Sequence, residues 1–166
     1  YVREVEYRVG KLELLRFASD PWSTPSIREV GAAFVAGPEL EHVHLAVNGR
    51  EAGETLSAGD RLRVSLVWFT PMIGIDEDYI VFVHLLDSNG MLVASHDGTP
   101  ANGIRPTSTW LPGDLVVDVH AFQLPAVLDS GLLTLSVGLY TRDTQKRQKV
   151  VGGGDSVAVF QYTVES

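Results

Sequence analysis

Side chains alternate between apolar and polar types, with a period of two, along most of this chain. Residues 61–68 show the pattern plainly, because Leu62, Val64, Leu66 and Trp68 alternate with polar neighbours. Residues 42–48 and 133–140 alternate in the same way. Successive side chains of a strand point to opposite faces, so this pattern indicates strands with one buried face. No window of helical length keeps a period of 3.6, and the chain is therefore predicted to be all-β.

Two segments, residues 79–86 and 115–122, are apolar on both faces, which predicts that they lie centrally in a sheet. Further strands are predicted at residues 2–9, 11–17, 30–35, 91–96, 148–151 and 157–164. Asn48-Gly49 and Asn89-Gly90 favour tight hairpins because they accept positive φ values. Residues 141–146 predict another hairpin connection, whose basic side chains are solvated. About ten strands predict a two-sheet antiparallel β-sandwich, Ig-like or jelly-roll and similar to carbohydrate-binding modules.

The length of 166 residues suits one domain, spanning 1–166. Residues 1–10 are expected to be either an edge strand or a linker from a preceding domain. The chain begins with Tyr1 rather than Met, which suggests a piece of a longer polypeptide. No apolar run approaches the roughly 18–20 residues that a membrane helix needs, so this segment is not expected to insert into a bilayer.

The charge and the cysteine count exclude several classes of function. A formal net charge of −8 disfavours binding to nucleic acid and to anionic lipid. The absence of cysteine removes disulfides, thiolate zinc sites and thiol nucleophiles. No cofactor is predicted.

Four polar residues fall at apolar positions of predicted strands or next to them: His84, Asp97, Asp118 and His120. Buried polar groups need partners. If the strands are neighbours, these four side chains are expected to form one hydrogen-bonded network. A metal site is the alternative, with structural calcium favoured by the oxygen ligands.

Other histidines suggest chemistry that their surroundings do not support. His42 and His44 share a strand face with the spacing used by cupin-like metal barrels, but Asn48 and Gly49 occupy the places where a cupin glutamate would follow. They are predicted to be surface histidines. Ser95-His96-Asp97 is not a catalytic triad, because consecutive strand residues point to opposite faces. No catalytic residue is predicted.

Two segments rich in Pro, Gly, Ser and Thr, residues 19–28 and 98–113, are candidate binding loops. Trp22 lies in the first, and Trp110 and Arg105 lie in the second. Flat aromatic rings stack on sugars, so these three residues are the candidate ligand contacts. The alternative for Trp110 is that it closes one end of the sandwich, whereas Trp68 is predicted to lie in the core.

The stretch from Gly59 to Tyr140 resembles a known family. The resemblance rests on the strings Ala58-Gly59-Asp60-Arg61-Leu62-Arg63-Val64, Val81-Phe82-Val83-His84-Leu85-Leu86-Asp87, His96-Asp97-Gly98, Trp110-Leu111-Pro112-Gly113-Asp114 and Val137-Gly138-Leu139-Tyr140. These strings are similar to the soluble C-terminal domain of some bacterial multi-pass membrane glycosyltransferases, which are like the dolichyl-phosphate-mannose-protein mannosyltransferases. The resemblance covers about half of the chain.

The resemblance implies an accessory, non-catalytic domain on the extracytoplasmic face of a bacterial membrane. Its partners would be the preceding membrane domain of the same polypeptide and a glycan or acceptor. Two other functions stay open: a free-standing carbohydrate-binding module, and a metal-dependent enzyme that uses His42 and His44 or the His84, Asp118 and His120 set.

Overall fold

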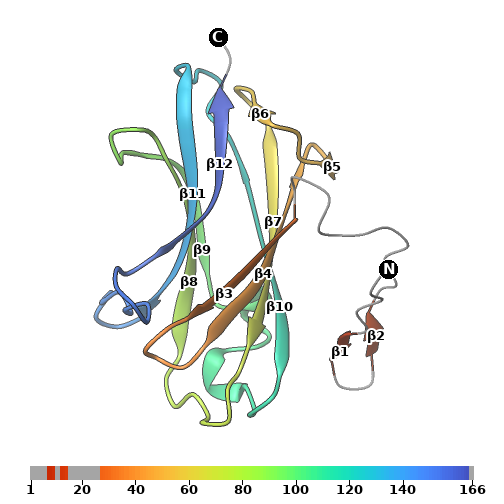
Figure 1. Ribbon diagram of the computed structural model, residues 1–166, viewed down its shortest axis with the longest axis vertical. Helices are drawn as coiled ribbons and strands as arrows, with labels where there is room; N and C mark the ends of the chain where they lie inside the picture. The colour runs from red at the N-terminus through yellow and green to blue at the C-terminus, as the bar shows by residue number, and fades with distance from the viewer. Residues whose placement is uncertain (1–6, 10–11, 15–26, 165–166) are drawn as a thin grey trace.

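The structure is a computed structural model that describes residues 7–9, 12–14 and 27–164. Residues 27–164 form two β-sheets that pack face to face (Figure 1). The larger strands are β3 (Ile27–Ala33), β4 (Glu39–Val47), β7 (Arg61–Phe69), β8 (Tyr79–Leu86), β9 (Leu92–Gly98), β10 (Leu115–Gln123), β11 (Gly131–Thr141) and β12 (Val157–Val164). The short elements are β1 (Tyr7–Val9), β2 (Leu12–Leu14), β5 (Arg50–Glu51), β6 (Thr55–Leu56) and the 3-10 turns η2 (Ala101–Gly103) and η3 (Thr107–Thr109).

The strand order in the two sheets is that of an immunoglobulin-like sandwich. One sheet has the order β10-β7-β4-β3, with β5 paired to β4, and the other has the order β6-β12-β11-β8-β9. Strands β4, β7 and β10 take the places of A, B and E, while β8, β9, β11 and β12 take those of C, C′, F and G. Of the two predicted sandwich types, the neighbour order therefore favours the Ig-like one.

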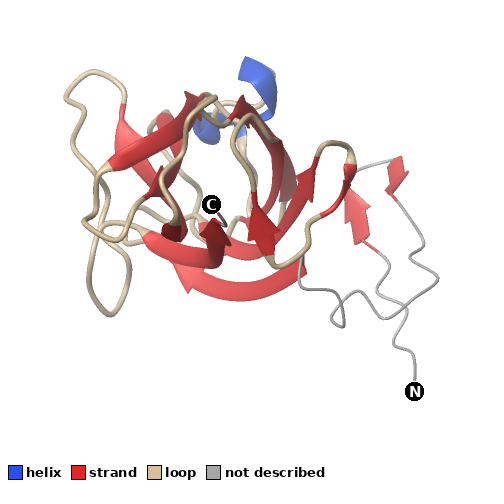
Figure 2. Ribbon diagram, turned by 90° about the horizontal axis from the view of Figure 1, so that it is seen from above, coloured by secondary structure: helices blue, strands red, loops and turns tan. Residues whose placement is uncertain are grey.

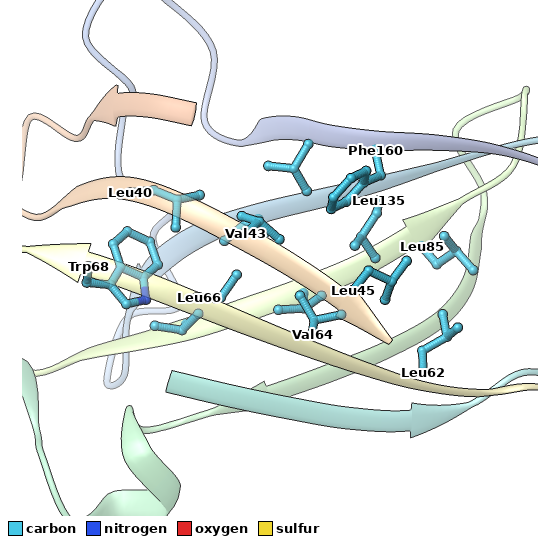
Figure 3. Close-up of a cluster of buried hydrophobic side chains, with 14 of the residues drawn as sticks. Leu40, Val43, Leu45, Leu62, Val64, Leu66, Trp68, Leu85, Leu135 and Phe160 are labelled. Carbon is cyan, nitrogen blue, oxygen red and sulfur yellow. The ribbon is translucent and has the colours of Figure 1, made fainter. Parts of the chain in front are cut away.

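Side chains that alternate inward from both sheets build the core (Figure 3). Strand β7 contributes Leu62, Val64, Leu66 and Trp68, each at most 1% exposed. Strands β8 and β11 supply the facing layer. Burial of this kind stabilises the fold by roughly 25 cal/mol for each Å² of apolar surface removed from water. The sequence has a period of two because alternate residues of each strand point into the core between two facing sheets. The predicted all-β sandwich is confirmed.

The predicted turns agree with the structure. Asn48 and Gly49 both have positive φ, 52° and 76°, and connect β4 to β5. Gly90, with φ of 77°, lies in the hairpin between β8 and β9. The 141–146 connection is also closed, because the Thr141 N–H donates to the Lys146 carbonyl. Local turn chemistry was sufficient to place these three connections.

One predicted strand is absent, one predicted as central lies at an edge, and two more are tested only in part. Residues 148–151 form no strand; Val150 makes only an isolated bridge to Phe34. Strand β10 is not central, since among the described residues it is the edge of its sheet and pairs with β7. Its apolar outward position Val117 is 41% exposed. The predicted strands at 2–9 and 11–17 are described only as β1 and β2, and their remaining residues lie outside the described part of the chain.

Candidate functional site

A hollow of about 290 Å³ lies where β9 and β10, edge strands of opposite sheets, lie against each other. The loop that joins these two strands carries the 3-10 turns, at the lower end of Figure 1 and to one side of the sandwich in Figure 2. We call this hollow the edge pocket. Its lining residues are His96, Asp97, Gly98, Thr99, Asn102, Gly103, Asp118, Val119 and His120.

Three side chains behind the edge pocket form a hydrogen-bonded series. His120 Nε2 lies 2.7 Å from Asp118 Oδ2, and His120 Nδ1 lies 2.8 Å from His96 Nδ1. Asp118 and His120 are each 1% exposed. They are two residues apart on β10, so both side chains point inward. The series therefore crosses from the edge of one sheet to the edge of the other.

The Asp118 carboxylate also holds the loop that borders the edge pocket. The Ala101 N–H donates to Asp118 Oδ1 at 2.9 Å. Ala101 and Asn102 have φ values of 53° and 54°, a left-handed conformation that costs a residue with a Cβ roughly 1–2 kcal/mol. Gly103 follows with φ of 84°. Asp118 thus fixes an unusual backbone segment against β10, and this segment places Asn102 in the lining of the pocket.

His96 is the part-buried member of the series. Burial lowers the pKa of His96 below its ordinary value, and neighbouring His120 lowers it further, while Asp118 and Asp97 act in the opposite direction. His96 is therefore neutral at neutral pH. A neutral imidazole has one donor nitrogen and one acceptor nitrogen.

A second histidine–aspartate pair lies on the outer face of the sheet. His84 Nε2 is 3.1 Å from Asp97 Oδ1. Asp97 is also next to Tyr140, whose pKa is raised by burial, by the charge of Asp97 and by a hydrogen bond to it. Asp97 and His96 are consecutive on β9 and therefore point to opposite faces.

The predicted single network of His84, Asp97, Asp118 and His120 is thus wrong. Strands β8 and β10 lie in different sheets, and the four residues divide into an inner pair and an outer pair. The inner pair is continued by His96, which the sequence analysis considered in the rejected Ser-His-Asp string and in the strings of the family resemblance but not as a partner of this pair. The available signal was the alternation along β9, which turns His96 away from Asp97 and toward the interior.

Aromatic packing covers the outer face around His84. The Phe82 ring lies 4.6 Å from the His84 ring and 6.2 Å from Tyr140, between ring centroids. The Arg147 guanidinium lies over Phe82 at 4.6 Å. Gly138 permits this packing, because a Cβ there would lie 2.2 Å from Phe82 Cζ. This region is a small second core rather than an open site.

The residues considered for metal binding do not converge. His44 Nε2 lies 2.9 Å from Glu51 Oε2 on the surface, and burial lowers the pKa of His42. No group of three or more His, Asp or Glu side chains arranged to hold a metal ion occurs in the described ranges. The sequence suggested two sets of metal ligands. Neither of them forms a coordination shell in the described residues: not His42 with His44, and not His84 with Asp118 and His120.

Trp110 is buried, at 2% exposure, so the expectation that it stacks on a ligand is wrong. Its Nε1–H donates to the Arg105 carbonyl at 2.9 Å, and its ring lies 6.4 Å from that of Trp68. Trp110 therefore closes one end of the core, which was the alternative expectation, and Trp68 is fully buried as predicted. Arg105 pairs with Asp114 at 2.8 Å and does not line the edge pocket. Trp22 lies outside the described residues.

Two solved structures were compared with this fold, and one of them shares it. The crystal structure of the C-terminal domain of wzt matches with a TM-score of 0.59 and 18% identity, over 88% of this chain and 84% of that chain. A beta-glucosidase from Listeria innocua, in complex with gluconolactone, matches with a TM-score of 0.39 and 17% identity, over 75% of this chain and 16% of that chain. The first likeness shows the β-sandwich fold, and the second is too low to support a statement about this chain.

No protein-family model and no curated protein matches the sequence. Within residues 7–9, 12–14 and 27–164, no helix has the length and apolar character required to span a bilayer.

Proposed function

We propose that this chain is a non-catalytic accessory β-sandwich domain that binds a neutral glycan in the edge pocket. Its parent would be a larger membrane glycosyltransferase-like protein, with the domain on the extracytoplasmic face of a bacterial membrane. The fold that it shares with the C-terminal domain of wzt supports an accessory role, since that domain also belongs to a longer chain. The parent protein and the location rest on the sequence resemblance.

The observation that carries the proposal is the chemistry of the pocket lining. The lining contains imidazole, carboxylate, amide and hydroxyl groups but neither lysine nor arginine. The Asp118 carboxylate lies in the lining and the chain has a net charge of −8, which disfavours an anionic ligand, although Arg142 donates to the hydroxyl of the lining residue Thr99. Groups of this kind bind hydroxyls by hydrogen bonds. The volume of about 290 Å³ lies just below the roughly 300–1,000 Å³ of typical ligand sites, which suits no more than a single sugar ring.

Catalysis is not part of the proposal. The series of Asp118, His120 and His96 resembles the base of a nucleophilic triad, but a triad also needs a nucleophile within hydrogen-bond reach of the base. In the described residues, His96 has no hydrogen bond to a hydroxyl group. The proposed role of the series is to hold the pocket in shape.

A pair of matched variants tests the site. Asn102→Gly removes an amide from the pocket without straining the backbone, because glycine accepts the φ of 54°. Gln145→Gly is the control: Gln145 has the same φ of 54°, is exposed at a hairpin tip and is not among the residues that line the pocket. We expect Asn102→Gly to weaken glycan binding about fivefold, which corresponds to one hydrogen bond of about 1 kcal/mol, and Gln145→Gly to leave it unchanged.

The measurement is a calorimetric and NMR titration with neutral oligosaccharides of mannose, glucose and galactose, and with a phosphorylated sugar for comparison. The neutral sugars should bind more tightly. No binding by any of them up to millimolar concentration, or equal losses in both variants, contradicts the proposed site. Membrane helices encoded upstream in the full gene would support the proposed parent, and a gene that encodes this domain alone would refute it.

A further inference from the structure

The series of Asp118, His120 and His96 has a definite direction when both imidazoles are neutral, because each ring then carries a proton on one nitrogen only. A carboxylate accepts hydrogen bonds and does not donate them. Asp118 Oδ2 faces His120 Nε2 at 2.7 Å, so the Nε2 atom carries the proton. In a neutral imidazole the other nitrogen is then an acceptor. His120 Nδ1 therefore accepts a hydrogen bond.

The donor to His120 Nδ1 is His96. The two Nδ1 atoms are 2.8 Å apart, a distance at which one must donate and the other accept. Since His120 Nδ1 accepts, His96 Nδ1 carries the proton and His96 Nε2 keeps its lone pair. Among the described residues, the His96 ring makes no other hydrogen bond, and His96 lines the edge pocket.

We propose that Asp118 and His120 fix His96 in its Nδ1–H form, so that His96 Nε2 offers a hydrogen-bond acceptor to a donor hydroxyl in the edge pocket. This inference rests on the proposed function only for the identity of the ligand. It makes Asp118 and His120 positioning residues and His96 a residue that determines specificity. A ligand that offers only acceptors at this point would be rejected.

The charged and titratable groups around His96 are His120 and Asp118 on β10 and Asp97 on its own strand. The turn η2, which also borders the pocket, contributes Asn102 and Gly103, which do not titrate. Protonation of His96 places a proton on Nε2 and converts the acceptor into a donor. Ligand binding should therefore weaken in acid, in step with the titration of His96.

The first test needs no ligand. Long-range proton–nitrogen correlation spectra of the labelled protein at pH 7.5 report which nitrogen of each histidine carries the proton. We expect Nδ1–H for His96 and Nε2–H for His120. An Nε2–H form of His96, or a doubly protonated His120, would overturn the inference.

The second test uses two variants of His96 whose new side chains differ in length. The Gln amide oxygen can occupy the place of Nε2, whereas the Asn side chain reaches only the place of Nδ1. We expect His96→Gln to retain binding of the neutral oligosaccharides within about threefold, and His96→Asn to lose at least tenfold. Equal losses in both variants would contradict the acceptor role.

The two proposals fail in different ways. If no glycan binds but His96 is the Nδ1–H form, the proposed function is wrong and the fixed ring orientation stands. If glycans bind but His96 is the Nε2–H form, the function stands and the inference is wrong.

Discussion

Two histidine–aspartate pairs on this sandwich are alike in geometry and differ in surroundings. The inner pair, His120 with Asp118, is separated by 2.7 Å, and its side chains are 1% and 2% exposed. The outer pair, His84 with Asp97, is separated by 3.1 Å, and its side chains are 16% and 34% exposed. Water can replace a lost partner in the outer pair but not in the inner one. Burial rather than distance should therefore decide what each pair contributes to stability.

The largest effect is expected from His120→Ala. This change leaves the buried Asp118 without its partner and takes the acceptor from His96. Removing one member of a buried pair costs about 3–5 kcal/mol, and we expect a loss of that size in the free energy of unfolding, measured by urea denaturation. His44→Ala is the control, because His44 pairs with Glu51 on the surface and should lose less than about 1 kcal/mol. Equal losses of unfolding free energy in the two variants would contradict the claim that burial decides what such a pair contributes.

A smaller effect is expected from Gly138→Ala, which tests whether packing or the polar pair dominates the outer face. The new Cβ would lie 2.2 Å from Phe82 Cζ and 2.9 Å from the Asp155 carbonyl oxygen. Overpacking of this kind costs about 1–3 kcal/mol, and thermal unfolding measures the loss. Gly74→Ala is the control, since a Cβ there meets nothing within 4 Å. A tolerated Gly138→Ala would mean that the Phe82 ring moves freely.

Asp97→Ala should cost still less. The pair with His84 is partly exposed, and such pairs contribute about 0–1 kcal/mol. We expect a loss below about 1 kcal/mol by urea denaturation. A loss as large as that of His120→Ala would show that the outer pair contributes as much to the free energy of unfolding as the inner pair does.

The smallest expected effect is a dependence of the free energy of unfolding on pH, which is absent at neutral pH. The unfolded chain takes up a proton at His96 near the ordinary pKa of 6.5, and the folded chain does so only at lower pH. The free energy of unfolding should therefore fall as the pH drops below about 6.5. His42 contributes in the same direction, because burial lowers its pKa too. Urea denaturation of His96→Gln between pH 7.5 and 5 should show a shallower decline than the wild type; an unchanged decline would contradict the assignment.

Much of the fold was predictable from local signals. Residues 79–86 and 157–164 were predicted as strands with the bounds that the structure has. These two predictions were correct because they depend on the alternation of side chains and on the flanking turns, both of which are local properties. The strand prediction at residues 148–151 was wrong because only Val150 packs against the core and pairs, through a single isolated bridge to Phe34, while Val151 is 63% exposed.

The candidate site was predictable only in its parts. The sequence marked Asp118 and His120 as polar groups at buried positions, and the structure pairs them. It did not indicate His96 as their neighbour, because β9 and β10 belong to different sheets and meet only at their edges. It left two roles open for Trp110, a ligand contact in a loop or a plug at one end of the core, and the structure shows the plug.

The amino-acid pattern alone indicated that this chain folds into strands, where several of the turns lie and which strand faces are buried. These properties depend on the alternation of neighbouring side chains and on the φ values that Asn and Gly accept. The tertiary structure was needed to show that β10 is an edge strand among the described residues and that His96 contacts His120. The physical reason is that sheet order depends on contacts between residues far apart in the chain, and no local pattern encodes which strand a buried polar group will face.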